Sequence, residues 1–128
     1  MAEPLQVRVV TPEKPMFDGA ADFIVVPAHD GEIGILPRHA RLLASLGVGE
    51  LRITRGGELQ RFFVESGFVQ VAAGHVTVLC ERASTLDALD PAAVEAAAAQ
   101  ARAAGAPNAE ALAQRAAVVR RLTARAGR

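Results

Sequence analysis

Hydrophobic and polar residues alternate along short runs between residues 5 and 82, which is the pattern of β-strands that bury one face. Glycine, proline and aspartate separate the runs and indicate turns. The runs predict strands at residues 5–10, 22–26, 50–55, 58–65, 67–71 and 75–81, and two more within residues 33–46. Short, evenly spaced strands are typical of an antiparallel β-sandwich or a flattened barrel.

Four short segments are interpreted as turns between these strands. Gly56 and Gly57 form a two-residue hairpin connection, where positive φ angles are required and glycine adopts them at little cost. Residues 73–74 are interpreted as a turn before the last strand. Residues 17–19 are interpreted as a turn after the first strand, and residues 66–67 as a turn at the entry to a strand.

After the last predicted strand the composition changes to alanine, and two helices are predicted. Asp90 suits the N-cap of a helix over residues 91–104, and Gly105 suits its C-terminal cap. Asn108 suits the N-cap of a second helix over residues 109–126. Because the connection is short, the two helices are expected to be antiparallel neighbours.

The chain is therefore predicted to consist of a β-sandwich domain at residues 1–86 and an antiparallel α-helical hairpin at residues 87–128. Alanine has the highest helix propensity, so both helices are locally favoured. An alanine face buries little apolar area, and docking strength scales with that area at roughly 25 cal/mol per Å². The hairpin is expected to be helical but weakly docked.

The composition argues against several classes of function. Lys+Arg and Asp+Glu both number 14 and only 4% of residues are aromatic, which disfavours binding to nucleic acid or to an anionic membrane. The single cysteine, Cys80, cannot form an internal disulfide and favours a reducing compartment. The N-terminus lacks the pattern of a signal peptide, and no apolar run approaches the ~20 residues of a membrane-spanning helix.

The residues capable of chemistry form no recognisable constellation. His29, His39 and His75 are scattered without ligand spacing, so no metal site is expected. Cys80 lies in an alternating strand and is interpreted as a small core residue. Residues 31–34 hold two glycines but open no helix, so they do not form a phosphate-binding loop. Neither a cofactor nor an enzymatic activity is predicted.

The second predicted helix is rich in arginine. From Ala111 onward there are five arginines and no acidic residue. One interpretation is a solvated helix face whose cations lie near the helix C-terminus. The other is docking to an acidic protein surface. The residues by themselves leave both interpretations open.

The most informative segment is GEIGILPRHARLLASL at residues 31–46. It is accompanied, in order, by VVTPE at 9–13, MFDG at 16–19, GEL at 49–51, FVESGFVQV at 63–71 and VTVL at 76–79. In their order and spacing these segments resemble the epsilon subunit of bacterial F-type ATP synthases. That family also combines an N-terminal β-sandwich with a C-terminal helical hairpin.

The resemblance implies a central-stalk (rotor) subunit that couples proton flow to ATP synthesis and is itself non-catalytic. The implied partners are the gamma subunit, the ring of membrane-embedded subunits and, transiently, the catalytic alpha and beta subunits. The loop with Glu32 and His39 would face the ring, with Glu32 as the main contact. The implied location is peripheral, on the cytoplasmic face of the bacterial plasma (inner) membrane, through the complex alone.

The resemblance further implies that the hairpin is regulatory. In that family it moves between a compact state and an extended state that blocks ATP hydrolysis. Arg115, Arg120, Arg121 and Arg125 would then contact acidic segments of the catalytic subunits.

Some members of the family bind ATP through an I/L-D-x-x-R-A motif on the hairpin. This chain keeps Leu89 and Asp90, but Ala93 replaces the arginine and Val94 the alanine. Because the missing guanidinium is the group that would pair with phosphate, weak ATP binding or none is expected.

A protein from another functional class is the alternative to the rotor subunit. It would be a free-standing β-sandwich binding module with a helical oligomerisation hairpin. Copurification with a gamma subunit distinguishes the two hypotheses, because only the rotor subunit is expected to copurify.

Overall fold

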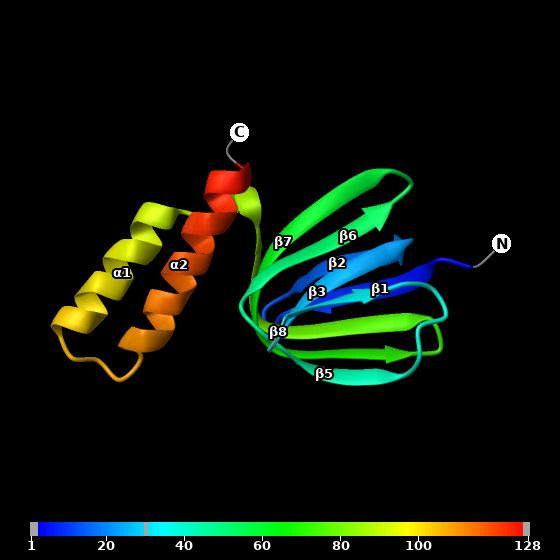
Figure 1. Ribbon diagram of the computed structural model, residues 1–128, viewed down its shortest axis with the longest axis horizontal. Helices are drawn as coiled ribbons and strands as arrows, with labels where there is room; N and C mark the ends of the chain where they lie inside the picture. Colours follow the sequence, from blue (N-terminus) through cyan, green and yellow to red (C-terminus); the bar gives the residue numbers. More distant parts are fainter. Residues whose placement is uncertain (1–2, 30, 127–128) are drawn as a thin grey trace. The chain divides into compact units, whose positions relative to one another are not determined.

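The computed structural model describes residues 3–29 and 31–126, and the side chains of these residues except 87, 125 and 126. The chain divides into two compact units, Met1–Ser84 and Thr85–Arg128. The first unit is built of strands and the second of helices (Figure 1). Each unit is described by itself below.

The described residues of the first unit form eight strands. They are β1 (Leu5–Val10), β2 (Pro15–Ala21), β3 (Phe23–Ala28), β4 (Gly31–Ile35), β5 (Leu42–Leu46), β6 (Gly49–Arg55), β7 (Glu58–Ala72) and β8 (His75–Thr85). The second unit holds a short 3-10 helix η1 (Leu86–Ala88) and the helices α1 (Pro91–Ala103) and α2 (Ala109–Ala126). Every strand predicted from the alternating pattern overlaps an observed one.

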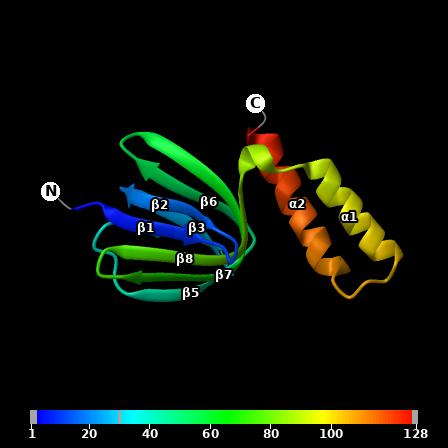
Figure 2. The same cartoon turned by 180° about the vertical axis from the view of Figure 1, so that it is seen from behind.

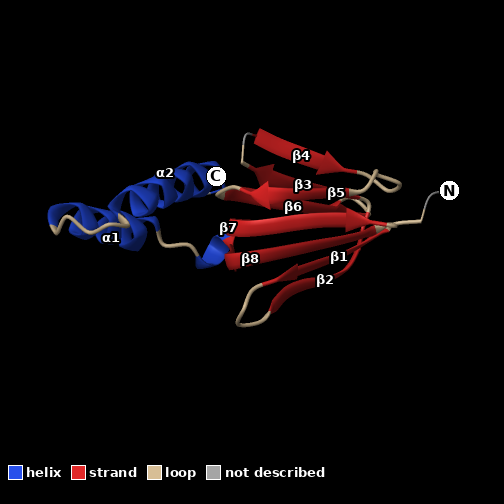
Figure 3. Cartoon of the chain, turned by 90° about the horizontal axis from the view of Figure 1, so that it is seen from below, coloured by secondary structure: helices blue, strands red, loops and turns tan. Residues whose placement is uncertain are grey.

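The strands form one sheet that folds over into two layers (Figure 3). The strand order is β2-β1-β8-β7-β5-β3-β4, and β6 pairs with both β3 and β7. Ala28 of β3 pairs with Leu46 of β5. The predicted sandwich or flattened barrel is thus confirmed. Its pairs β1–β2, β3–β4, β5–β7 and β6–β7 are antiparallel, whereas β1 and β8 pair in parallel.

The core lies between the two layers and is built from alternate residues of the strands. Leu5, Val7 and Val9 of β1 are fully buried, while the residues between them are exposed. The same alternation buries Val69 and Val71 of β7. Successive side chains of a strand point to opposite faces of the sheet. Each strand therefore contributes one row of side chains to the core and a second row to the surface.

The interpretation of residues 17–19 as a turn was wrong, because they lie within β2. Phe17, Asp18 and Gly19 pair with Val9, Arg8 and Val7 of β1 in antiparallel register. The chain reverses earlier, at residues 11–14, where the Thr11 hydroxyl donates to the Lys14 carbonyl at 2.9 Å and accepts from the Lys14 amide at 3.2 Å. Since β2 lies at the edge of the sheet, aspartate and glycine are tolerated there.

The interpretation of residues 66–67 as a turn was also wrong, because β7 continues through them. Ser66 and Gly67 have φ angles of 59° and 136°, so the strand bends without ending. Residues 58–64 pair with β6, and residues 67–71 pair with β5. The bend therefore carries one continuous strand from one layer into the other.

The hairpin predicted at residues 56–57 and the turn predicted at residues 73–74 are confirmed. Gly56 and Gly57 have φ angles of 58° and 85° and connect β6 to β7. Ala73 and Gly74 have φ angles of 51° and 80° and connect β7 to β8. Two successive positive φ angles suit the right-handed twist of the strands that they join.

The two helices of the second unit form the predicted hairpin (Figure 2). The Asp90 carboxylate caps α1 by accepting from the amides of Ala92 and Ala93 at 3.1 and 3.2 Å. At the other end, Gly105 takes a φ of 65°, and the Ala106 amide donates to the Ala101 carbonyl at 2.9 Å. This is the Schellman arrangement, and it ends α1 as the sequence predicted.

Small side chains line the buried positions of the hairpin. Ala98 and Ala101 of α1 are buried, as are Ala116, Val119 and Leu122 of α2. Three of these five side chains are methyl groups, and a fourth is the short branched side chain of valine. They offer little apolar area for packing, which agrees with the shallow apolar face predicted from the sequence. Weak docking of the hairpin stays a prediction.

Candidate functional site

A network of charged side chains spans β4, β6 and β7. At its centre, the Glu50 side chain is 3% exposed and accepts from Arg52 Nη1 at 3.0 Å through Oε1. Its other oxygen, Oε2, accepts a hydrogen bond from Arg61 Nε. Arg52 and Arg61 are directly opposite each other in the β6–β7 register. Like charges in that position repel, so Glu50 stabilises both by lying between them.

The network reaches the surface through Glu32. Arg52 Nη1 donates to Glu32 Oε2 at 3.3 Å, and Arg52 Nη2 lies 3.5 Å from Glu32 Oε1. The Glu32 side chain is 54% exposed. Partial burial acts to lower the pKa of Arg52, but the hydrogen bonds and charges of Glu50 and Glu32 outweigh it, so the pKa is raised.

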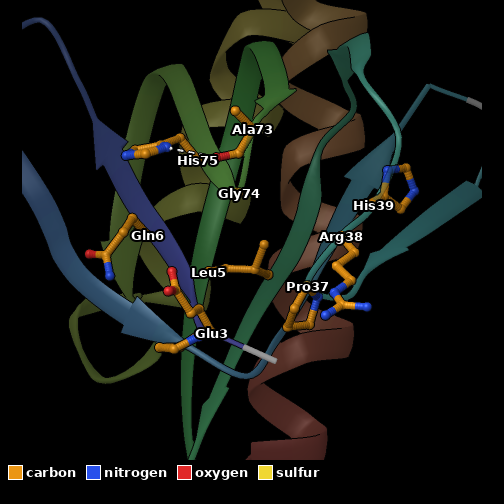
Figure 4. Close-up of a pocket in the computed structure, with 10 residues that line it drawn as sticks. Glu3, Leu5, Gln6, Pro37, Arg38, His39, Ala73, Gly74 and His75 are labelled. Atoms are coloured by element: carbon orange, nitrogen blue, oxygen red, sulfur yellow. Dashed lines mark hydrogen bonds between the residues drawn. The ribbon is translucent and has the colours of Figure 1, made fainter. Parts of the chain in front are cut away.

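His39 lies in a different place, in a surface pocket of about 620 Å³ (Figure 4). The pocket is lined by residues 3–6 at the start of β1, by the β4–β5 loop with Arg38 and His39, and by the β7–β8 turn together with His75, the first residue of β8. His39 Nδ1 lies 2.7 Å from the Ala40 carbonyl oxygen, and His75 Nδ1 lies 3.1 Å from that of Ala73. The segment that the sequence suggested as one contact loop therefore contributes Glu32 and His39 to separate surroundings.

Metal ligands do not gather in the part of the chain that the structure describes. Among residues 3–29 and 31–126, no three or more His, Cys, Asp or Glu side chains lie close enough to hold a metal ion. His39 and His75 share a pocket, but the other groups that line it include the guanidinium of Arg38. A cation would be repelled by that guanidinium and attracted by the carboxylate of Glu3, which also lines the pocket.

Cys80 lies on the inner face of β8, as its place in an alternating strand predicted. It is 4% exposed, and its Sγ lies 3.6 Å from the Val10 carbonyl oxygen. Burial raises the pKa of the Cys80 thiol to about 11. The thiol therefore stays protonated near neutral pH, which makes it a poor nucleophile.

The outer face of β5, β7 and β8 exposes large apolar side chains that the sequence reading did not single out. Leu43, Phe68 and Leu79 are 72%, 54% and 52% exposed. Phe68 and Leu79 also line a groove of about 440 Å³ with Val10 and Pro12. These side chains occupy the outward positions of alternating strands, where polar residues are usual. Apolar residues at outward positions were the feature of the sequence from which this surface could have been predicted. We call Phe68, Leu79 and Val10 the apolar patch.

The arginines of α2 are in unequal surroundings. Arg120 Nη1 lies 3.2 Å from Glu95 Oε1 of α1, so an acidic residue outside α2 compensates one of the cations. Arg115 is half-buried and has an interaction partner, whereas Arg121 is exposed. The side chain of Arg125 lies outside the described residues. The Arg120–Glu95 pair is exposed, and such a pair is worth about 0.2–1 kcal/mol.

The residues of the degenerate nucleotide motif have structural positions in the hairpin. Asp90 is the N-cap of α1, and Leu89 directly precedes it as the C-cap of η1. The Asp90 carboxylate is occupied by two backbone amides of the first turn. Ala93 stands where the family motif has arginine, so this position provides no cation to pair with phosphate.

Among the described residues, the structure contains no helix with the length and hydropathy needed to span a membrane.

Comparisons with known proteins agree on one family. Residues 4–85 match the family model described as "ATP synthase, Delta/Epsilon chain, beta-sandwich domain". The ATP synthase epsilon chain of Acidithiobacillus ferridurans is 46% identical over 107 residues, which cover 82% of this chain and 76% of that one. The epsilon chain of Desulforamulus reducens is 42% identical over 90 residues, covering 70% and 68%.

Two solved assemblies contain chains of similar fold. One is the Euglena gracilis mitochondrial ATP synthase OSCP/F1/c-ring, with a TM-score of 0.71 at 20% identity, covering 93% of this chain and 76% of that chain. The other is the Tetrahymena thermophila mitochondrial ATP synthase central stalk and c-ring. Its TM-score is 0.57 at 21% identity, with 68% and 70% covered. At these identities the likeness concerns the fold.

Proposed function

Since the chain belongs to the epsilon subunit family of ATP synthases, we propose that it works as a rotor subunit of the central stalk and couples ion flow to ATP synthesis. The family match over residues 4–85 is the observation that carries this proposal. The chain itself performs no chemical step. In support, the Cys80 thiol stays protonated and the Glu50 carboxylate is held by two arginines. The alternative of a free-standing binding module gains no support from these relatives.

The gamma subunit is the proposed partner of the apolar patch. Phe68 and Leu79 are about half exposed, and they line one groove with Val10. Apolar side chains at the centre of an interface carry much of its binding energy, and phenylalanine is among the residues enriched there. Completing the burial of a half-exposed phenylalanine contributes about 1 kcal/mol. A permanent partner on this face removes an apolar surface from water.

The membrane-embedded ring is the proposed partner of Glu32. Its side chain is 54% exposed, and a carboxylate oxygen can accept more than the one hydrogen bond that Arg52 donates to it. The cation or polar group that it meets would come from a loop of the ring. His39 lies in a separate pocket. We therefore propose that His39 makes a contact with the complex that is separate from the contact made by Glu32.

The helical hairpin is proposed to restrain ATP hydrolysis by contacting acidic segments of the catalytic subunits transiently. Arg115, Arg120, Arg121 and Arg125 supply the positive charge. Glu95 competes for Arg120 within the hairpin, because the two side chains form an exposed ion pair. Glu95→Gln would break this ion pair and leave Arg120 available to the catalytic subunits. Inhibition is expected to strengthen, at most by the free energy of an exposed ion pair, which is about 1 kcal/mol.

Nucleotide binding has no part in the proposed regulation. The degenerate motif lacks its arginine, and Asp90 already caps α1. The subunit is proposed to lie on the cytoplasmic face of the bacterial plasma membrane, held there by the complex.

Reconstitution tests the proposal. The cognate ATPase complex is depleted of this subunit, and either the full chain or residues 1–86 are added back while ATP hydrolysis is measured. Inhibition by the full chain alone is expected. Binding of both without inhibition would leave the rotor role in place and remove the regulatory one. If neither bound the complex or copurified with gamma, the rotor role would be wrong. Circular dichroism of the truncated chain checks that it is folded.

A further inference from the structure

Arg52 joins the buried and the exposed part of the charge network. The same nitrogen, Nη1, donates to buried Glu50 at 3.0 Å and to exposed Glu32 at 3.3 Å. We infer that Arg52 is a positioning residue that holds the Glu32 carboxylate in the orientation in which it meets the membrane ring. This inference rests on the ring contact proposed for Glu32 and adds the residue that prepares it.

The inner end of Arg52 is fixed by the fold. Glu50 is 3% exposed and is held by a second bond from Arg61 Nε, so its carboxylate has little freedom to turn. Arg52 is itself only 28% exposed. Removing a cationic partner from a buried carboxylate strongly destabilises the folded state. The Arg52 guanidinium is therefore held beside Glu50. Arg52 is therefore a fixed donor to Glu32.

The register explains why an arginine occupies this position. Strand β3 lies between β4 and β6, with Val25 opposite Arg52 and Pro27 opposite Glu32. The side chain must reach diagonally across β3, and strands two apart are separated by roughly 10 Å. Arginine has the length for this reach. Its planar fork also directs Nη1 and Nη2 at both oxygens of Glu32, which a single ammonium group cannot do.

The two ends of the network differ in strength, and the difference suits a contact residue. The Glu50 bonds are shielded from water, whereas the Glu32 pair is half exposed and screened by solvent. Glu32 can therefore exchange part of its interaction with Arg52 for a donor on the ring while Arg52 remains on Glu50. Holding a flexible glutamate beforehand removes part of the ordering cost of association.

The test measures binding of labelled full-length chain to membranes that carry the cognate ATP synthase stripped of this subunit. Variants Glu32→Gln and Arg52→Lys are compared singly and together, with Arg55→Lys as the control. Arg55 is an exposed arginine on the same strand, outside the network. Arg52→Lys keeps a cation for Glu50 but loses the fork. Glu32→Gln alone and Arg52→Lys alone are each expected to bind about two- to tenfold more weakly than the unchanged chain. Arg55→Lys is expected to bind as strongly as the unchanged chain.

The double variant separates positioning from a structural role. If Arg52 acts through Glu32, Arg52→Lys has no further effect once Glu32→Gln is present. Equal losses in both backgrounds would overturn the inference. Should thermal unfolding show that Arg52→Lys destabilises the β-sandwich, binding of all variants is compared at a temperature at which circular dichroism shows each of them to be folded.

The ring contact and the positioning role fail in different ways. Unchanged binding of Glu32→Gln would show that the proposed ring contact itself is wrong. Weaker binding of Glu32→Gln together with unchanged binding of Arg52→Lys would leave the ring contact standing and refute the positioning role of Arg52.

Discussion

Among the described glycines with positive φ, Gly67 is the one whose replacement by alanine is expected to disrupt the β-sandwich most. A Cβ at this position would lie 1.8 Å from the Leu79 carbonyl oxygen and 2.9 Å from the Cys80 Cα. Both are backbone atoms of β8, so no side-chain rotation relieves the overlap. The strands β7 and β8 would have to separate at the bend that carries β7 between the two layers.

The magnitude follows from two contributions. The φ of 136° is a conformation that non-glycine residues rarely adopt, and such strain costs about 1–3 kcal/mol. Separation of the strands breaks ladder hydrogen bonds that are worth about 0.5–1.5 kcal/mol each. Together about 3–5 kcal/mol is expected, a large part of the roughly 5–15 kcal/mol that stabilises a domain. In a domain of this size the midpoint of thermal unfolding falls by at least about 12 °C.

Gly74→Ala is the matched control for Gly67→Ala. Gly74 also has a positive φ, 80°, but no heavy atom lies within 4 Å of the added Cβ, so only the backbone strain remains. The chain has neither tryptophan nor tyrosine, so unfolding is followed by calorimetry and far-ultraviolet circular dichroism rather than by intrinsic fluorescence. If Gly67→Ala were no less stable than Gly74→Ala, the close approach of β7 to β8 would be refuted.

Three further predictions concern the thiol, the apolar patch and the arginines. Between about pH 9 and 11 the unfolded Cys80 thiol loses its proton while the folded one keeps it, so the free energy of unfolding should fall by about 2–3 kcal/mol. Urea unfolding across this range measures the fall, and its persistence in Cys80→Ala would contradict the assignment. Phe68→Ala with Leu79→Ala should weaken gamma binding by about 1–3 kcal/mol in a titration, with an unchanged unfolding midpoint; undiminished binding would exclude the apolar patch. Arg120→Ala with Arg121→Ala should raise ATP hydrolysis by the reconstituted complex while gamma binding persists, and unchanged inhibition would make this face merely solvated.

Local patterns in the sequence were sufficient for most of the secondary structure. Alternation located the strands because one face of each is buried, as Val69 and Val71 show against exposed Phe68. Capping residues located the helices because Asp90 and Gly105 satisfy orphan backbone groups within a few residues of themselves. The family segments led to the rotor hypothesis, which the curated relatives support.

The features that failed or were missed all depend on residues distant in the chain. Residues 17–19 read as a turn until pairing with β1 placed them in a strand, and Gly67 read as a turn because its true constraint, Leu79, lies in another strand. The link from Glu32 through Arg52 to Glu50 arises only when β4, β3 and β6 lie side by side. Sequence periodicity reports which face a residue occupies, but the neighbour across a strand is set by register, and register is a property of the assembled sheet.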